Sequence, residues 1–191
     1  MTRENILDAA AKIFGQKGYH GTSMQDIADA VGLKKASLYY HISSKQEILL
    51  ALLDQALDLL IEQIQAATNH DSAPPEKLQR AMRTYLQILA DNSELAAVLL
   101  IEHRSLSPEL HSRHIPRRDR FERLWRDLIQ EGVDTGAFHC VDTAQATRAL
   151  LGLMNWTITW YHPEGVLSPT EISDQFAGIM LNGLLTRNGE T

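Results

Sequence analysis

The chain has 191 residues, of which 44% are hydrophobic, and a formal net charge of −6 at pH 7. It is long enough to bury a sizeable core in one or two domains, and it contains no run of about 18 apolar residues that could span a membrane. The N-terminus lacks the apolar core of a signal peptide, and the single cysteine, Cys140, excludes an internal disulfide. We therefore expect a cytoplasmic protein, with Cys140 as a small half-buried apolar residue near a turn.

Apolar residues recur with helical periodicity along almost the whole chain, and no segment alternates as a half-buried strand would. The pattern predicts an all-α fold of about nine helices. A proline-rich break at 69–75 separates the fourth helix from the fifth, and Ser107–Pro116 is expected to hold one short helical turn. The helices are expected at 3–17, 24–31, 35–41, 45–68, 75–91, 94–104, 117–132, 142–161 and 168–185.

Residues 24–43 carry the most informative pattern, which is a short helix, a glycine turn and a second short helix. Ile27 and Ala28 point inward from the first helix, and Gly32 stands where the chain must turn with a positive φ. Leu38 supplies an apolar contact that fixes the two helices at a steep angle. This is the spacing of a helix-turn-helix, in which the second helix can enter the major groove of DNA.

The second helix exposes cations, hydroxyls and flat rings, which suit phosphates and base edges. These residues are Lys34, Lys35, Ser37, Tyr39, Tyr40 and His41. The alternative is a purely structural helix pair with a solvated Lys-Lys face. Two capping boxes are expected beside the pair, Thr22-x-x-Gln25 and Ser44-x-x-Glu47, and each would start a helix.

The charge is unevenly distributed along the chain. Residues 1–50 hold six Lys/Arg and five Asp/Glu, whereas the remainder holds twelve and nineteen. The segment proposed to meet DNA is therefore the one part that is not strongly acidic. An acidic remainder would also discourage contact with DNA through the wrong face.

At these residues the chain resembles the tetracycline-repressor (TetR) family of bacterial transcription regulators. The matching positions include Arg3–Phe14, Lys17–Ser23, Ile27-Ala28, Gly32-Leu33, Leu38–His41 and Ser44–Leu49. Ile42 stands where the family usually has Phe, so we expect looser local packing there and an intact fold.

The resemblance implies a homodimeric, ligand-responsive repressor that binds a roughly palindromic double-stranded DNA operator, without a cofactor, in the bacterial cytoplasm in association with the nucleoid. Residues 1–46, the DNA-binding head, would contact the operator through the second helix of the pair, with Thr22, Ser23 and Lys45 on flanking phosphates. Residues 47–191 would form the ligand-binding and dimerisation body, and the helix at 45–68 would connect the two.

The last two expected helices are apolar around more than one stripe, which a surface helix of a monomer rarely tolerates. They are either simply core, or they form a four-helix dimer interface with a second copy, which the resemblance also implies. The expected interface residues are Leu150, Met154, Ile158, Phe176, Ile179, Met180 and Gly183.

The resemblance further implies an effector pocket in the body. Its expected lining is Met82, Tyr85, Leu86, Leu89, Leu99, His103, Leu124, Leu128, Asn155 and Trp156. For each residue, the alternative is a plain hydrophobic core with surface charges.

Seven basic or titratable residues crowd positions 113–126, against an otherwise acidic body. Arg117 and Arg118 could bind an anion such as the phosphates of a coenzyme-A thioester. The alternative is a salt-bridged face, with pairs three and four residues apart on one helix. The segment from Gly152 to Gly165 is similar to a TetR subgroup that includes acyl-CoA-responsive regulators, so the effector is expected to be small and hydrophobic or of acyl-CoA type.

The sequence favours neither a metal site nor an enzyme. His103, His111 and His114 have spacings that could suit a metal, but prolines bracket the last two and no cysteine is near, so no metal site is predicted. The sequence lacks a glycine-rich phosphate loop or a nucleophile elbow, so no enzymatic activity is predicted. The rival interpretation is a helical ligand-binding or adaptor protein that does not bind DNA.

Overall fold

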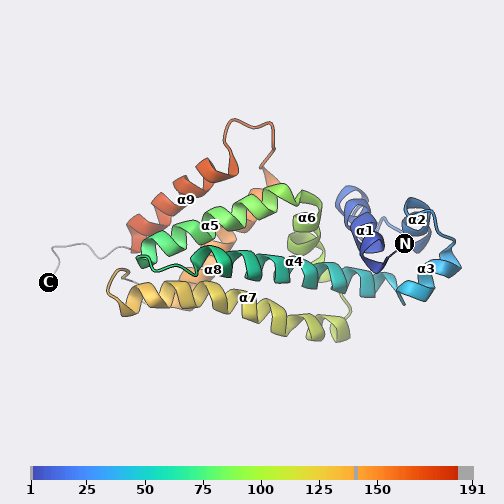
Figure 1. The fold of residues 1–191 in the computed structure, drawn as a ribbon, viewed down its shortest axis with the longest axis horizontal. Helices are drawn as coiled ribbons and strands as arrows, with labels where there is room; N and C mark the ends of the chain where they lie inside the picture. Colours follow the sequence, from blue (N-terminus) through green and yellow to red (C-terminus); the bar gives the residue numbers. More distant parts are fainter. Residues whose placement is uncertain (1, 140–141, 185–191) are drawn as a thin grey trace. The chain divides into compact units, whose positions relative to one another are not determined.

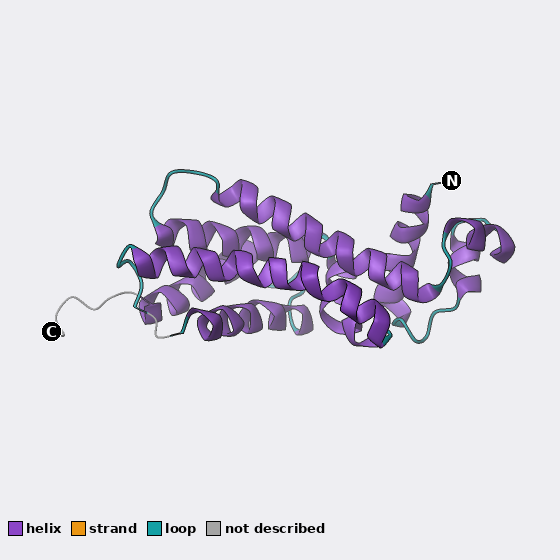
Figure 2. Cartoon of the chain, turned by 90° about the horizontal axis from the view of Figure 1, so that it is seen from below, coloured by secondary structure: helices purple, strands orange, loops and turns teal. Residues whose placement is uncertain are grey.

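The computed structural model describes residues 2–139 and 142–184. Within these ranges the chain forms nine α-helices and two short 3-10 helices, and Figure 2 shows no strand among the described residues. The expected all-α class is confirmed. Cys140 and Leu185 lie outside the described residues. The helices are α1 (Arg3–Lys17), α2 (Met24–Ala30), α3 (Lys35–His41), α4 (Lys45–Thr68), α5 (Pro74–Asp91), α6 (Ser93–Ile101), η1 (Glu102–Ser105), α7 (Pro108–Asp134), α8 (Thr143–Asn155), η2 (Trp156–Thr159) and α9 (Pro169–Leu184).

The chain divides into two compact units whose bounds differ from a simple cut along the sequence. The first unit is Met1–Leu59 with Asn92–Arg118, and the second is Leu60–Asp91 with Asp119–Thr191. Helices α4 and α7 each contribute their first part to the first unit and the rest to the second. The functional division at residue 46 stays a prediction, because compactness alone does not say which residues contact DNA.

In the first unit, α1, α2 and α3 gather at the start of α4, and α6 packs against α1 (Figure 1). The interior holds fully buried side chains from each of these helices, including Ile6, Phe14, Ile27, Leu38 and Leu49. Close approach of α1 and α6 depends on Gly15, because a Cβ at that position would lie 3.1 Å from the Cα of Glu94. Ile42 is 5% exposed, so the smaller side chain still closes the interior at this position.

The second unit is built around α5, which packs along α9, as Figure 1 shows for the pair. Leu78, Ala81, Met82 and Tyr85 form the buried face of α5 at helical spacing. Near the surface of this contact, Arg83 Nε lies 2.6 Å from a carboxylate oxygen of Asp174 on α9. The unit therefore combines an apolar core with an ion pair at its edge.

The expectation of a single short turn at Ser107–Pro116 is wrong, because α7 runs unbroken from Pro108 to Asp134 with Pro116 inside it. A proline in a helix interior normally costs about 3 kcal/mol. Here Pro116 is exposed, so water can solvate the carbonyl that loses its partner. His114 and Arg117, on either side of the proline, both bind Asp54 of α4, and these long-range contacts hold the helix together.

Capping explains where several helices begin. Ser44 Oγ accepts a 3.1 Å hydrogen bond from the backbone N–H of Glu47 at the start of α4, as the sequence predicts. The box at the start of α2 is formed by Ser23 and Asp26, so the expected box of Thr22 with Gln25 is wrong by one residue. Ser23 is the residue just before Met24 and has the extended backbone of a capping residue, so its hydroxyl, and not that of Thr22, caps α2.

Candidate nucleic-acid interface

A tight turn fixes α2 and α3 against each other. Gly32 has φ of +66°, which a glycine adopts without strain, and the N–H of Leu33 donates a 2.9 Å hydrogen bond to the carbonyl of Ala28. Ile27, Ala28 and Leu38 are all 0% exposed beneath the turn. The helix pair is therefore rigid, as a helix that must enter a groove needs to be.

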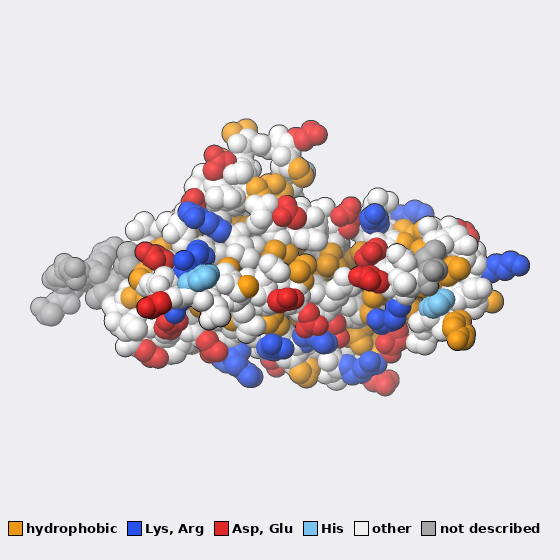
Figure 3. All heavy atoms as spheres, viewed as in Figure 1, with side chains coloured by type: hydrophobic (Ala, Val, Ile, Leu, Met, Phe, Trp, Pro, Cys, Tyr) orange, Lys and Arg blue, Asp and Glu red, His pale blue; other side chains and the backbone are white. Residues whose placement is uncertain are grey.

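The outward face of α3 carries the residues that the sequence singles out. Tyr40 is 87% exposed and Tyr39 is 45% exposed, while Lys34, Lys35 and Ser37 are also exposed. The ring of the half-buried His41 stands edge-on to Tyr40, with centroids 5.5 Å apart. In Figure 3, a basic side chain projects into solvent from the region where Figure 1 draws α2 and α3. The exposed tyrosine rings and the neighbouring lysines of α3 therefore form a surface suited to nucleic acid.

Ser23 lies at the N-terminus of α2, where its hydroxyl and backbone N–H both bond to Asp26. Hydrogen bonds from the Ser23 side chain, and then from its backbone, lower the pKa of Asp26 to about 2. Asp26 therefore keeps its charge and its capping role until the pH falls toward about 2. Ser23 itself is exposed, but its hydroxyl and its N–H already donate to Asp26, so the expected phosphate contact stays a prediction.

The side chains of Thr22 and Lys45 donate hydrogen bonds to carbonyls inside the protein. They therefore do not face solvent in the way that a phosphate contact requires. Thr22 is 2% exposed and its hydroxyl donates to the carbonyl of Gly18. The Lys45 ammonium donates to the carbonyls of Tyr19 and Thr22, at 2.9 and 2.7 Å, and stands 4.2 Å from the Tyr19 ring centroid. Lys45 thus ties the start of α4 to the turn between α1 and α2.

Glu102 and Gln46 help to position the helix pair, a role that the sequence did not predict. The backbone N–H of Tyr19 donates to Glu102 of η1 at 2.9 Å, and His20 Nε2 lies 3.0 Å from Ser105 Oγ. Gln46 uses both ends of its amide, donating to the Ser105 carbonyl and accepting from the Ser107 N–H at 2.8 and 2.9 Å. The η1 segment is therefore hydrogen-bonded to the α1–α2 turn and to the first turn of α4.

The residues expected to bind an effector are mostly core, and they divide between the two units. Met82, Tyr85, Leu86, Leu89 and Leu128 are buried in the second unit, where Leu124 and Asn155 are half-buried and Trp156 is exposed. In the first unit, Leu99 is buried and His103 is half-buried. Burial, with a smaller effect of Arg104, lowers the pKa of His103, so its neutral form is favoured. The ligand-binding set stays a prediction.

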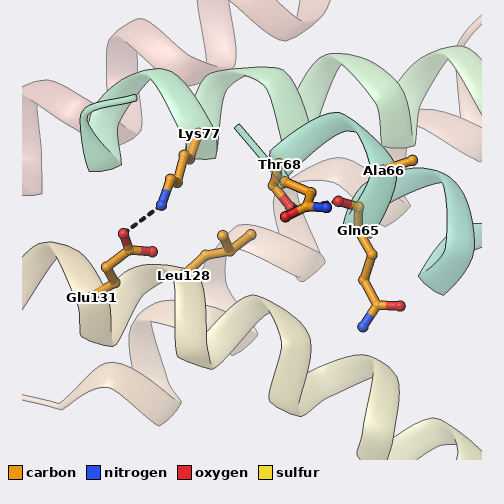
Figure 4. Close-up of a pocket in the computed structure, with 7 residues that line it drawn as sticks. Gln65, Ala66, Thr68, Lys77, Leu128 and Glu131 are labelled. Carbon is orange, nitrogen blue, oxygen red and sulfur yellow. Dashed lines mark hydrogen bonds and ion pairs between the residues drawn. The ribbon is translucent and has the colours of Figure 1, made fainter. Parts of the chain in front are cut away.

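A surface pocket of about 490 Å³ lies in the second unit, and five of the seven residues that line it are polar. Figure 4 shows Lys77 of α5 and Glu131 of α7 facing each other, joined by a 2.6 Å ion pair. Leu128 is the one expected effector residue in its lining. Because an ion pair lies in the lining and only Ala66 and Leu128 are apolar residues, this pocket is a poor match for a hydrophobic effector.

The arginine-rich start of α7 is paired with α4 within the first unit. Arg113 binds Glu47 at 2.9 Å, and Arg117 binds both Asp54 and Asp58, at 2.6 and 2.8 Å. These pairs join two helices, whereas the sequence suggested pairs along one helix. Because Arg117 already holds two carboxylates, and Arg118 also has an interaction, the geometry favours a salt-bridged surface, and anion binding stays a prediction.

The residues expected at the dimer interface do not all face outward. Leu150 and Met154 of α8 are 0% exposed, so they belong to the core of the protomer. Ile158, Phe176 and Met180 are half-buried, and Ile179 is 64% exposed. Gly183 belongs to α9, and its surroundings are outside what the structure describes. The α9 residues Phe176, Ile179 and Met180, together with the exposed Trp156, are thus the side chains that a second copy of the chain could contact.

Two further findings bear on function. Within residues 2–139 and 142–184, no three side chains of His, Cys, Asp or Glu come together as a metal site. Over the same residues, no helix has both the length and the apolar character needed to cross a bilayer.

A rigid helix-turn-helix with an exposed aromatic and basic second helix, joined to a helical body, defines a DNA-binding transcription regulator. The chain belongs to the TetR family of bacterial regulatory proteins. Residues 6–52 match the model of "Bacterial regulatory proteins, tetR family", and residues 71–184 match that of "Tetracyclin repressor-like, C-terminal domain".

Among curated relatives, the chain is 27% identical over 190 residues to the HTH-type transcriptional repressor KstR2 of Mycolicibacterium smegmatis, covering 98% of this chain and 93% of that protein. Among solved structures, it is similar to the TetR family regulator PfmR from Thermus thermophilus, with a TM-score of 0.85 and 39% identity over 95% and 99% of the two chains. It is also similar to AibR in complex with isovaleryl coenzyme A and operator DNA, with a TM-score of 0.86 and 29% identity over 93% and 96%.

Proposed function

We propose that this protein is a homodimeric repressor that binds a roughly palindromic operator and is released from it by a small hydrophobic or acyl-CoA effector. The observation that carries the proposal is the surface of α3, where Tyr40 is 87% exposed beside Lys34 and Lys35. Burying such a ring would be favourable, so its exposure is best explained by a partner surface. The protein acts in the bacterial cytoplasm at the nucleoid, and it is not an enzyme.

The contact residues divide by chemistry. Lys34 and Lys35 suit backbone phosphates, whereas Ser37, Tyr39, Tyr40 and His41 suit base edges and the groove wall. Thr22 and Lys45 position the helix pair through their internal bonds, so we leave them out of the operator contacts. Two copies related by a two-fold axis would place their α3 helices about one DNA turn apart, which demands a near-palindrome.

Effector release follows from differential binding. In one state of the dimer the two DNA-binding heads fit the operator, and in another they do not. An effector that binds the second state more tightly lowers the affinity for the operator, and the operator lowers the affinity for the effector by the same factor. AibR, a similar structure, binds isovaleryl coenzyme A and operator DNA, and this supports an acyl-CoA effector here.

The DNA half of the proposal is tested by a gel shift with the DNA upstream of the protein's own gene. Wild type should give a discrete, salt-dependent shift, and Tyr40→Ala should abolish it with no change in helicity or in molecular mass in solution. The control is Val166→Ala, since Val166 is 99% exposed on a loop of the second unit. A Tyr40→Ala protein that still shifts the operator would refute the assignment of α3, and absence of any wild-type shift would favour the adaptor interpretation.

The effector half is tested by titrating the operator complex with acyl-CoA thioesters and with the matching free fatty acids. Thioesters should release the operator at lower concentration than the acids do. Equal potency, or no release by either, would remove the acyl-CoA assignment and leave the DNA assignment standing.

A further inference from the structure

Three aromatic side chains form a buried cluster in the second unit. The ring of Tyr85 on α5 lies edge-on to Trp125 on α7, with centroids 5.7 Å apart, and Phe121 lies 5.9 Å from Tyr85 and 6.3 Å from Trp125. Trp125 is 0% exposed and Tyr85 is 1% exposed. The Tyr85 hydroxyl has a partner, since it donates a 2.5 Å hydrogen bond to Asn155 Oδ1 on α8. Burial of the Tyr85 hydroxyl raises its pKa.

The indole N–H of Trp125, in the same cluster, has no hydrogen-bond partner. An unpaired donor in apolar surroundings costs free energy, and such groups are rare in folded proteins. Phenylalanine at this position would supply a buried ring without the unpaired donor. The indole N–H of Trp125 therefore makes no hydrogen bond that would stabilise the protomer.

Two other buried polar atoms of the described residues lack partners, but each has a simpler explanation. Arg80 Nε belongs to a half-buried guanidinium whose other nitrogen bonds to Ser72. The Ser173 side chain lies within α9, where a change of χ1 brings a serine hydroxyl to a carbonyl one turn earlier on its own helix. The indole has one donor in a direction fixed by its ring, so it can be satisfied only by an acceptor that comes to it.

We infer that Trp125 is a specificity-determining residue of the effector site, and that its indole N–H donates a hydrogen bond to a neutral carbonyl oxygen of the effector. The inference rests on the proposed function and deepens it, because it names the group that the regulator recognises. The neighbours Tyr85 and Phe121 are uncharged rings, and no cation among them would offset a carboxylate that lost its water. A thioester carbonyl is neutral, so it meets the requirement that a free fatty acid does not.

The test removes the donor without changing the shape of the side chain. Trp125 is replaced by benzothienylalanine, which carries sulfur in place of the N–H, and Trp125→Phe serves as a second variant. The matched control is the same replacement at Trp160, which is 41% exposed and contacts Phe176. Thermal unfolding and operator affinity without effector report whether each full-length variant is folded.

Each protein is then titrated calorimetrically with acyl-CoA thioesters, from isovaleryl to palmitoyl, and with S-alkyl-CoA thioethers that replace the carbonyl by a methylene. Wild type and the Trp160 control should bind the best thioester about tenfold more tightly than its thioether, as a neutral buried hydrogen bond warrants. The two Trp125 variants should bind both ligands equally.

Several outcomes overturn the inference. They are a Trp125 variant that keeps the full preference for the thioester, a wild type that binds the two ligands equally, and a wild type that binds no thioester. The gel shift without effector separates these outcomes from failure of the proposed function, since a wild type that ignores thioesters can still bind its operator.

Discussion

The backbone N–H of Tyr19 donates a 2.9 Å hydrogen bond to the carboxylate of Glu102, although 83 positions separate the two residues. Tyr19 lies in the turn that leads into α2, and Glu102 begins η1, so the bond joins the helix-turn-helix to the α6–α7 connection. Gln46 makes a second connection to the same segment through Ser105 and Ser107. The position of the helix pair is thus set by residues from the middle of the chain as well as by α4.

Replacing Glu102 by Ala should destabilise the first unit. The buried N–H of Tyr19 would lose a charged acceptor, which lowers the free energy of unfolding by about 1–3 kcal/mol. Glu102→Gln keeps an acceptor oxygen and should lose less. Thermal and urea unfolding measure the effect, with Glu62→Ala, an exposed carboxylate of α4, as the matched control. Equal stability of Glu102→Ala and Glu62→Ala would show that the bond does not hold the turn.

A charge on the outer face of α9 should weaken the dimer. Ile179 is 64% exposed in the protomer, and a dimer would bury it, so Ile179→Asp would place a charge without a partner in an apolar interface. We expect the dissociation constant of the dimer to rise at least about 100-fold, or about 2.7 kcal/mol, by sedimentation equilibrium. Val166→Asp, on an exposed loop, should leave the mass unchanged. A dimeric Ile179→Asp protein would move the interface elsewhere.

The cap at α2 should contribute stability that depends on pH. Because the hydrogen bonds from Ser23 lower the pKa of Asp26 from 3.8 to about 2, the folded state binds this proton less readily than the unfolded state. The contribution is therefore fully present above pH 3.8 and is lost as the pH falls toward 2. Ser23→Ala removes the largest cause and should move the pKa of Asp26 upward, as an NMR titration of its carboxyl would show.

The same titration contains an internal reference for the Ser23→Ala variant. Backbone and side-chain bonds from Ser168 lower the pKa of Glu171 at the start of α9. This shift should persist in the variant, because Ser168 is untouched. A pKa of Asp26 near 3.8 in the wild type would mean that the cap does not form in solution.

Local signals were sufficient for most of the helix-turn-helix. The periodic apolar residues and the glycines gave α1, α3 and α4 their observed bounds, and Gly32 has the positive φ that the turn needs. The outward position of Tyr40 also follows from helical spacing, since Leu38 takes the inward place on so short a helix. These features depend on neighbours within one or two turns, which a sequence displays directly.

Features that depend on distant residues could not be predicted in this way. The continuity of α7 through Pro116 depends on Asp54, about sixty positions earlier, and the inward bonds of Lys45 depend on carbonyls of the α1–α2 turn. Lys45 reads as a surface cation in the sequence because nothing local shows its partners. Leu150 and Met154 likewise match an interface pattern, while the packing of the second unit buries them in the protomer.

The salt dependence of operator affinity is the sharpest test of whether α3 binds DNA. Operator affinity is measured over a range of salt concentrations for wild type, for Lys35→Ala and for Arg148→Ala, which removes the same charge from an exposed site in the second unit. If Lys35 contacts a phosphate, Lys35→Ala should reduce the slope of log affinity against log salt by about 1, and Arg148→Ala should leave the slope unchanged. Identical slopes for wild type and Lys35→Ala would contradict the account.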